Sequence, residues 1–257
     1  MTTFSACIEM LYVPETDDIA ERMRMAARSG FTAVEFWWWT NKDLDAIEKA
    51  QRETGLKVTG MVAEPMIPLV DPSTHDRFLE GLKDSIAVAQ RFGAGVLIAQ
   101  TGDDQPGKSR REQRAALVSV LSRAADVLKG TGVVLAVEPL NTLIDHKGYY
   151  LSSTVEGLDI IDEVGREEIR ILYDVYHSLV MGEVTADVLA GRVDRVAHIH
   201  IADHFGRNEP GSGGLDLRAA LSWIKEHGYT GPAGLEFRPT FATEAAVDQT
   251  LAYFEGV

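Results

Sequence analysis

VVLAVE at residues 133–138 is a short apolar run that ends in a carboxylate, and such a run is typical of a buried β-strand. The pattern returns three more times in the second half of the chain, in IRILYD (169–174), VAHIH (196–200) and AGLE (233–236). Each run carries a polar side chain at or near its C-terminal end: Glu138, Asp174, His200 and Glu236. Functional groups of a parallel α/β barrel come from the ends of several strands, so this pattern favours a barrel.

The whole chain alternates apolar strand candidates with helical patterns. The helical pattern that begins at Ile19 stops at Gly30, and the next one stops at Gly55. Glycine is a common residue at the C-terminal end of a helix. A unit of about 30 residues, used eight times, predicts an α/β fold, a single (β/α)8 TIM barrel that spans residues 1–257 as one domain. The strand candidates are FSACIEM (4–10), AVEFW (33–37), KVTGMV (57–62), GVLIAQ (95–100), VVLAVE (133–138), IRILYD (169–174), RVAHIHI (195–201) and AGLEFR (233–238).

A doubly wound open sheet is the alternative fold. It would gather its ligands at one switch point rather than at the ends of consecutive strands, and no GxGxxG follows the first strand candidate. No composition shift or linker rich in Pro, Gly and Ser divides the chain. The barrel is therefore the better prediction.

The charge of the chain limits its partners. Its 39 Asp and Glu residues against 25 Lys and Arg residues give a net charge of −14, which repels nucleic acids and anionic membranes. The single cysteine, Cys7, lies in an apolar run and is expected to be a buried, inert thiol. The chain starts directly with a strand pattern and shows no signal peptide or transmembrane span, so we expect a cytoplasmic protein.

The residues at the four strand ends are the donors that a divalent cation prefers, because three are carboxylates and one is an imidazole. Each has a structural explanation when taken alone: Glu138 as a rim residue, Asp174 as a helix cap, His200 as a core histidine, Glu236 as the partner of Arg238. Brought together without a cation, they would suffer costly repulsion between buried like charges. We therefore predict that they bind one divalent metal ion.

Further polar side chains follow the same strands. His177 lies three residues after Asp174, and Arg207 is the one Lys or Arg residue of the glycine-rich loop 202–216. Both are candidates for contact with a substrate, with Arg238 as an alternative to Arg207 and Asn141 as a weaker candidate for a supporting contact.

Three consecutive tryptophans, Trp37, Trp38 and Trp39, follow the second strand candidate. They cannot all face one direction, so we expect at least one to pack under the helices. Another is expected to wall a pocket or to cover a subunit contact. Schiff-base chemistry is poorly served, because the only strand lysine, Lys57, opens its strand at the opposite face of the barrel.

Five stretches carry a resemblance to a known family: FSACIEMLY (4–12), VEPLN (137–141), YDVYH (173–177), HIHIADHFGRNEPGSG (198–213) and LEFRP (235–239). Over almost its whole length the chain resembles the hydroxypyruvate isomerase family of the xylose-isomerase-like TIM-barrel superfamily. The resemblance implies that Glu138, Asp174, His200 and Glu236 bind Mn²⁺ or Mg²⁺, with Co²⁺ as a further option. It also implies that Glu138 and Glu236 transfer protons, and that His177 and Arg207 contact the substrate.

The expected activity is therefore a metal-dependent isomerisation of a sugar or sugar acid, an aldose–ketose interconversion through a cis-enediolate. Two alternatives stay open: a ketose 3-epimerase that uses the same metal site, and a non-catalytic barrel that acts as a binding subunit. The expected partner is a small ketose, aldose or hydroxy-keto acid, and we expect the chain to form homo-oligomers. His200 stands where hydroxypyruvate isomerases can carry Gln, so the sequence leaves the exact substrate open.

Overall fold

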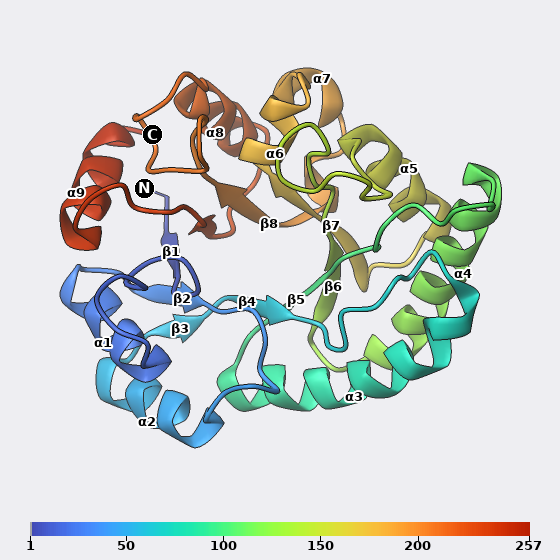
Figure 1. Cartoon of the computed structure of the whole chain (residues 1–257), viewed down its shortest axis with the longest axis horizontal. Helices are drawn as coiled ribbons and strands as arrows, with labels where there is room; N and C mark the ends of the chain where they lie inside the picture. The colour runs from blue at the N-terminus through green and yellow to red at the C-terminus, as the bar shows by residue number, and fades with distance from the viewer. Residues whose placement is uncertain (1) are drawn as a thin grey trace.

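The computed structural model describes residues 2–257 as a ring of parallel strands enclosed by helices (Figure 1). The predicted TIM barrel is confirmed. The domain limit that the sequence predicts at residue 1 lies outside the described residues. The strands are β1 (Phe4–Cys7), β2 (Ala33–Glu35), β3 (Lys57–Val58), β4 (Gly60–Val62), β5 (Val96–Ala99), β6 (Val134–Val137), β7 (Ile169–Asp174), β8 (Val196–Ile201) and β9 (Ala233–Leu235). The α-helices are α1 (Ile19–Arg28), α2 (Leu44–Thr54), α3 (His75–Phe92), α4 (Arg110–Leu128), α5 (Thr154–Val164), α6 (Val175–Val180), α7 (Thr185–Val188), α8 (Leu217–Glu226) and α9 (Thr243–Tyr253).

The strands β3 and β4 are two halves of one barrel strand, and the sequence predicted them as a single run. They are the two ends of the hydrogen-bonded order β3-β2-β1-β9-β8-β7-β6-β5-β4. Thr59 lies between the two halves, and its backbone N–H donates to the carbonyl oxygen of Val34 at 2.9 Å. In β4, the backbone N–H of Val62 donates to the carbonyl oxygen of Trp37 at 3.1 Å. The third strand position thus stays bonded to the second, and the sheet closes on itself.

Helix ends follow local signals in the sequence. The side chain of Asp43 accepts hydrogen bonds from the backbone N–H groups of Asp45 and Ala46 and so caps α2, a contact that contributes about 1 kcal/mol in typical helices. The helix ends at Gly55, whose φ of 71° is a left-handed conformation that glycine adopts without strain. These two signals fix where α2 begins and ends.

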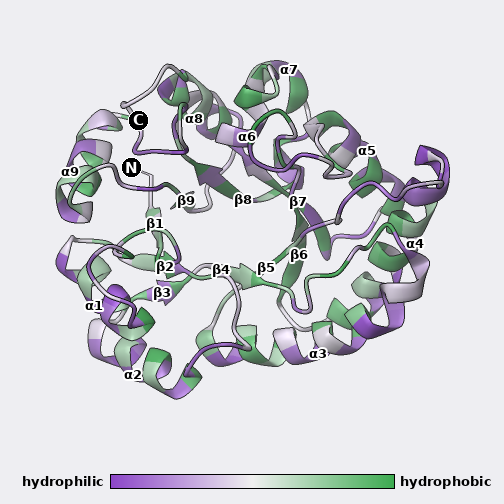
Figure 2. Ribbon diagram, in the orientation of Figure 1, coloured by the Kyte–Doolittle hydropathy of each residue, from purple (hydrophilic) through white to green (hydrophobic). Residues whose placement is uncertain are grey.

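The main hydrophobic core lies between the strands and the helices, and Figure 2 shows the apolar side of many helices turned toward the ring. Leu82 and Ile86 of α3 and Leu97 of β5 belong to this layer. A separate, smaller cluster of Ile98, Ala136 and Leu172 comes from alternating positions of β5, β6 and β7. Because neighbouring residues of a strand face opposite sides, this second cluster lies inside the barrel. Burial of each large aliphatic side chain stabilises the fold by about 1.5–3 kcal/mol.

All eight strand positions run in the same direction, so their carboxyl ends meet at one face of the barrel. The strand β1 ends at Cys7, three residues before the predicted end, because the N–H groups of Met10 and Leu11 turn back to the carbonyl oxygen of Cys7. Among residues 2–257, no helix has both the length and the apolar character that crossing a bilayer requires.

Candidate functional site

The four residues singled out at the strand ends converge in space. Glu138 directly follows β6, Asp174 is the last residue of β7, His200 lies near the end of β8, and Glu236 directly follows β9. One potential metal-ligand atom from each residue lies within 4.8 Å of the others, and all four residues are at most 4% exposed. We call these four residues the carboxylate cluster.

His200 lies between the two glutamates of the carboxylate cluster. Its Nδ1 atom is 3.3 Å from Oε1 of Glu138 and 3.2 Å from Oε2 of Glu236. One oxygen of Asp174 accepts a hydrogen bond of 2.9 Å from the backbone N–H of His177, which caps α6. The helix-cap explanation for Asp174 therefore holds as well, and it leaves the second oxygen of this carboxylate to face the cluster.

The electrostatics of the cluster are those of crowded, buried carboxylates. Burial raises the pKa of Glu138 and the pKa of Asp174 above their ordinary values. Burial acts in the same direction on Glu236, but the Arg207 guanidinium and the His200 ring outweigh it and hold the pKa of Glu236 below its ordinary value. A divalent cation would favour the ionised form of all three carboxylates.

The donor set fits such a cation. Three carboxylates and one imidazole nitrogen meet at one buried point, and hard divalent ions such as Mg²⁺ and Mn²⁺ accept mainly oxygen ligands in this way. Within residues 2–257, Arg207 is the only Lys or Arg side chain that forms an ion pair with the cluster. If a cation takes the lone pair of His200, the ring is neutral and one guanidinium cannot balance three ionised carboxylates, so a divalent ion would supply the missing charge.

Arg207 reaches the cluster from the glycine-rich loop 202–216. Its guanidinium forms an ion pair with Glu236 and lies 3.8 Å from Asp174. The loop is held by the buried carboxylate of Asp203, which accepts backbone N–H groups from residues 204, 211, 213 and 215. A side chain at position 213 would overlap the carbonyl of His204, so only Gly213 allows this path. Arg238 is exposed, and its backbone N–H donates to the carbonyl of Arg207 at 2.8 Å.

His177 is buried beside the cluster in a defined orientation. Its Nδ1 atom faces two donors of Asn141, the backbone N–H at 3.2 Å and the side-chain amide at 2.6 Å. The ring proton is therefore on Nε2, which lies 3.6 Å from Asp174 and has no hydrogen-bond partner among the described residues. Burial and the Arg207 charge lower the pKa of His177 well below its ordinary value, so the ring is neutral.

The Asn141 amide is itself held from the other side. It donates to Asp145 at 2.7 Å, and the Tyr176 hydroxyl donates to the same carboxylate oxygen at 2.7 Å. The sequence favoured Asn141 only weakly and offered no signal for Asp145, because these contacts join a loop to a helix that follows a different strand.

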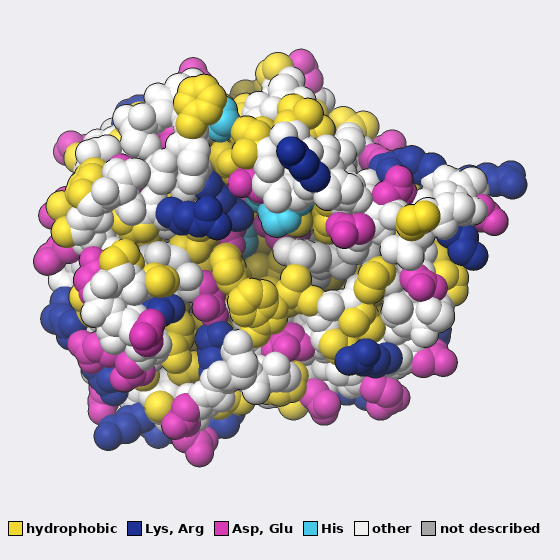
Figure 3. Space-filling view, in the orientation of Figure 1, with side chains coloured by type: hydrophobic (Ala, Val, Ile, Leu, Met, Phe, Trp, Pro, Cys, Tyr) yellow, Lys and Arg dark blue, Asp and Glu magenta, His cyan; other side chains and the backbone are white. Residues whose placement is uncertain are grey.

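A cavity of about 340 Å³ opens above the carboxylate cluster. Three members of the cluster, Glu138, His200 and Glu236, form its floor together with Arg207. The rest of the lining is Gln100, His146, Trp37, Trp38, Val62, Met66, Ile98 and Leu140. In the space-filling view, histidine side chains are visible in the hollow near the middle of the ring, with hydrophobic side chains along its edge (Figure 3).

The three tryptophans take different directions, as the sequence indicated. Trp37 lines the cavity and donates from Nε1 to Glu236 at 2.8 Å, and Trp38 lies at the rim, 36% exposed. Trp39 packs against the core and donates to the hydroxyl of Ser85 in α3 at 3.1 Å. The direct contact between Trp37 and Glu236 has no signature in the sequence.

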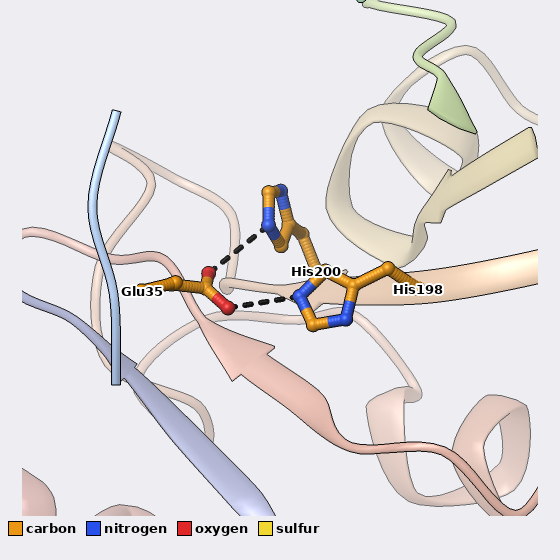
Figure 4. Close-up of side chains that lie close together, drawn as sticks. All are labelled: Glu35, His198 and His200. Atoms are coloured by element: carbon orange, nitrogen blue, oxygen red, sulfur yellow. Dashed lines mark hydrogen bonds and ion pairs between the residues drawn. The ribbon is translucent and has the colours of Figure 1, made fainter. Parts of the chain in front are cut away.

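Glu35, at the end of β2, is a buried carboxylate that sequence reasoning missed. It lies 2.8 Å from Nε2 of His198 and 3.0 Å from Nε2 of His200 (Figure 4). Burial acts to raise the pKa of Glu35, but the two rings outweigh it and lower the pKa to about 2. The available signal was a glutamate at the end of the apolar run AVEFW, the same pattern that drew attention to Glu138.

Sequence reasoning also missed one motif match. The segment GDDQPGKS at 102–109 has the spacing GxxxxGK[ST] of a phosphate-binding loop. The structure does not form that cradle over these residues. The N–H groups of residues 104, 105, 108 and 109 all donate within the protein, to carbonyls or to the side chains of Gln113 and Glu112. The carboxylates of Asp103 and Asp104 in the same segment would also repel a phosphate. The match is therefore a coincidence of spacing.

Comparisons with known proteins agree with this architecture. The profile of the family described as "Xylose isomerase-like TIM barrel" matches residues 23–256. Hydroxypyruvate isomerase of Escherichia coli (strain K12) is 31% identical over 256 residues, which cover 96% of this chain and 97% of the relative. Among solved structures, an AP endonuclease of family 2 from Brucella melitensis superposes with a TM-score of 0.90 at 24% identity, covering 98% of this chain and 99% of the other. A D-allulose 3-epimerase from Methylomonas sp. gives 0.79 at 20% identity, covering 99% and 97%.

Proposed function

The chain belongs to the xylose isomerase-like TIM-barrel family and is an isomerase, and we propose that it interconverts a short keto acid or ketose with its aldehyde isomer, as a hydroxypyruvate isomerase does. One observation carries the proposal. Two glutamates, one aspartate and one histidine nitrogen meet within 4.8 Å, and the glutamates and the histidine line a cavity large enough for a small molecule.

Glu138, Asp174, His200 and Glu236 would hold one divalent ion, Mn²⁺ or Mg²⁺ in our proposal, with Co²⁺ as a further option. Such an ion polarises the carbonyl and hydroxyl oxygens of a bound substrate and lowers the barrier to removal of a carbon-bound proton. The rest of the reaction is assigned to side chains of this chain.

The two glutamates are the proposed proton-transfer groups. With hydroxypyruvate, one of them takes a proton from C3 as the C2–C3 double bond of the cis-enediolate forms, the hydroxyl proton of O3 passes to O2, and a proton then returns to C2 as O3 becomes the carbonyl oxygen. The product is the 2-hydroxy-3-oxo acid, and no oxidant or reductant is needed. Glu138 and Glu236 suit these roles because they approach His200 Nδ1 together and both line the cavity.

His177 and Arg207 are the proposed substrate contacts. The Nε2–H of His177 has no partner among the described residues and would donate to a substrate oxygen. Arg207 presents a buried guanidinium at the cavity floor, where it would bind a carboxylate or a terminal hydroxyl.

The cavity lining supports a short substrate. Among the described residues that line it, Gln100 and His146 are polar besides Glu138, His200, Glu236 and Arg207, and much of the wall is made of apolar side chains such as Val62 and Met66. The extra hydroxyls of a pentulose or hexulose would be desolvated there without partners, at about 1–3 kcal/mol each. A three- or four-carbon substrate avoids that cost.

A ketose 3-epimerase is the second candidate, because two carboxylates flank one reaction centre and D-allulose 3-epimerase shares the fold. The proton would then return to the opposite face of the carbon it left. The comparisons do not support the alternative of a non-catalytic barrel that acts as a binding subunit, because the similar proteins are isomerases. We further propose that residues 1–257 form a single domain, that the chain associates into homo-oligomers, and that it acts in the cytoplasm on a small-molecule partner.

Product analysis by NMR after incubation in D₂O tests the assignment. The metal-loaded protein would be offered hydroxypyruvate, tetruloses and pentuloses. Deuterium on the carbon next to the one that lost its proton supports isomerisation, and deuterium on C3 of an inverted ketose supports epimerisation. Absence of turnover on every substrate in the presence of bound ion contradicts both.

A further inference from the structure

Glu35 does not belong to the carboxylate cluster, but it contacts one member of it from behind. One of its carboxylate oxygens lies 3.0 Å from Nε2 of His200 (Figure 4). The other ring nitrogen, Nδ1, faces Glu138 and Glu236. The imidazole of His200 thus lies between one outer carboxylate and the centre of the cluster.

We propose that Glu35 is a positioning residue that holds the His200 proton on Nε2 and so presents the Nδ1 lone pair to the metal ion. The inference rests on the metal site of the proposed function and adds a residue to it. A neutral imidazole has one protonated nitrogen and one lone pair, and only the nitrogen with the lone pair can bind a metal. A carboxylate accepts hydrogen bonds and donates none when ionised, so once a metal ion takes the lone pair of Nδ1, the ring proton belongs on Nε2, the nitrogen 3.0 Å from Glu35.

The carboxylate of Glu35 is fixed by more than His200. Its second oxygen lies 2.8 Å from Nε2 of His198 and accepts a hydrogen bond of 3.1 Å from the hydroxyl of Thr59. The Thr59 hydroxyl is in turn 2.7 Å from that of Ser5. Glu35 therefore cannot swing away from His200 without leaving buried donors unpaired, at about 1–3 kcal/mol each.

The neighbouring strand leaves space for this carboxylate. Gly234 lies opposite His200 in the register of β8 and β9. A Cβ atom at position 234 would lie 2.3 Å from one oxygen of Glu35 and 2.7 Å from the other. The backbone of Gly234 has no left-handed φ, so the reason for glycine here is the room that Glu35 occupies.

Carboxylates that hold a metal-binding histidine from behind also raise the basicity of the ring, and their loss lowers metal affinity about 10- to 100-fold. Glu35→Gln removes the charge and leaves one oxygen for two ring donors. Glu35→Leu removes both acceptors at similar volume. We expect both variants to bind Mn²⁺ about 10- to 100-fold more weakly than the wild type, measured by electron paramagnetic resonance of free Mn²⁺.

Glu64→Gln is the matched control. Glu64 is another buried glutamate of the barrel, and it accepts three hydrogen bonds, from the N–H groups of Trp39 and Thr40 and from the Thr40 hydroxyl. It contacts no member of the carboxylate cluster through these bonds. Its variant should lose stability in the same way and still bind Mn²⁺ with an affinity within about twofold of the wild type, because the ligand set and its support stay intact.

A second measurement needs no variant at Glu35. In wild-type protein loaded with Mg²⁺, ¹⁵N NMR should show the His200 ring protonated on Nε2 and not on Nδ1, with the signal assigned by its loss in His200→Gln. A proton on Nδ1 overturns the inference, and so does Mn²⁺ affinity within about twofold of the wild type in the Glu35 variants. If the wild type itself binds no Mn²⁺, the proposed metal site fails instead, so the two failures are distinguishable.

Discussion

The indole N–H of Trp37 donates a hydrogen bond of 2.8 Å to Oε1 of Glu236, while the other oxygen of this glutamate is paired with Arg207. The two carboxylate oxygens of Glu236 are therefore held in place by two side chains, Trp37 and Arg207, from different parts of the chain. The backbone N–H of Trp37 in turn donates to Glu9 at 3.1 Å, which fixes the start of the tryptophan segment. The orientation of Glu236, a proposed proton-transfer group, thus depends on Trp37 in the loop that follows β2.

Replacing Trp37 by Phe should separate orientation from shape. Trp37→Phe keeps an aromatic wall but removes the donor, and a hydrogen bond to a charged group contributes about 1.5–3 kcal/mol. We expect kcat to fall about 10-fold or more with KM little changed, because the loss acts on the reacting carboxylate. Steady-state kinetics measure it, and Trp38→Phe, whose indole N–H contacts Met66 at the rim, is the control. Equal kcat values in the two variants would contradict a role for the Trp37 contact.

Removing either proposed proton-transfer group should abolish turnover. Glu138→Gln and Glu236→Gln keep the side-chain shape but cannot accept the carbon-bound proton, so we expect kcat to fall by at least about 10²–10⁴-fold. In the variant that lacks the group removing the carbon-bound proton, the substrate C–H should also stop exchanging with D₂O, which NMR detects without product formation. Circular dichroism checks that each variant is folded. Near-normal turnover in either folded variant would remove that residue from the mechanism.

Bound metal should stabilise the folded chain. An ion at about 100 times its dissociation constant adds about 2.7 kcal/mol to the free energy of unfolding. For a chain of this size each kcal/mol raises Tm by about 2–4 °C. Chelator-treated protein should therefore melt lower than protein with Mn²⁺, in a thermal-shift measurement. Asp174→Asn should lose most of the shift, whereas a shift of unchanged size in that variant would place the ion elsewhere.

Alkaline pH should reveal the burial of Tyr12. Burial raises the pKa of its hydroxyl from 10.0 to about 12, and the side chain is 1% exposed. The folded state holds this proton more tightly than the unfolded state, so stability is unaffected below pH 10 and falls as the pH rises toward 12. Tyr12→Phe lacks that proton and should lose less stability than the wild type over this range, by up to about 3 kcal/mol in urea unfolding. Parallel pH profiles for the two proteins would contradict the burial effect.

The barrel and its four strand-end residues could be predicted from the sequence because both follow from short-range patterns. Apolar runs about 30 residues apart imply parallel strands, and parallel strands place their carboxyl ends at one face. The side chains of Glu138 and Glu236, almost 100 residues apart in the chain, could be brought together by that argument alone.

The sequence could not predict side-chain contacts between distant strands, because the pattern of apolar runs does not say which side chains meet. Glu35 and His200 are 165 positions apart, and nothing in AVEFW or HIHIAD says which ring nitrogen faces which carboxylate. The split of the third strand at Thr59 is of the same kind, since the Thr59 hydroxyl bonds to Ser5 and Glu35 across the barrel interior. The same limit explains why GDDQPGKS matched a motif whose fold it does not adopt, since the motif describes spacing and not the destination of each N–H.

The fit between Gly234 and Glu35 leads to a prediction about their coupling. Gly234→Ala places a methyl group where the Glu35 carboxylate lies, and overpacking of this kind costs about 1–3 kcal/mol. In a Glu35→Ala background the obstructing carboxylate is gone, so the same substitution should cost much less. Urea unfolding of the two single variants and the double variant gives the coupling energy, which we expect to reach at least about 1 kcal/mol. Additive effects would mean that the backbone, rather than the carboxylate, requires glycine at position 234.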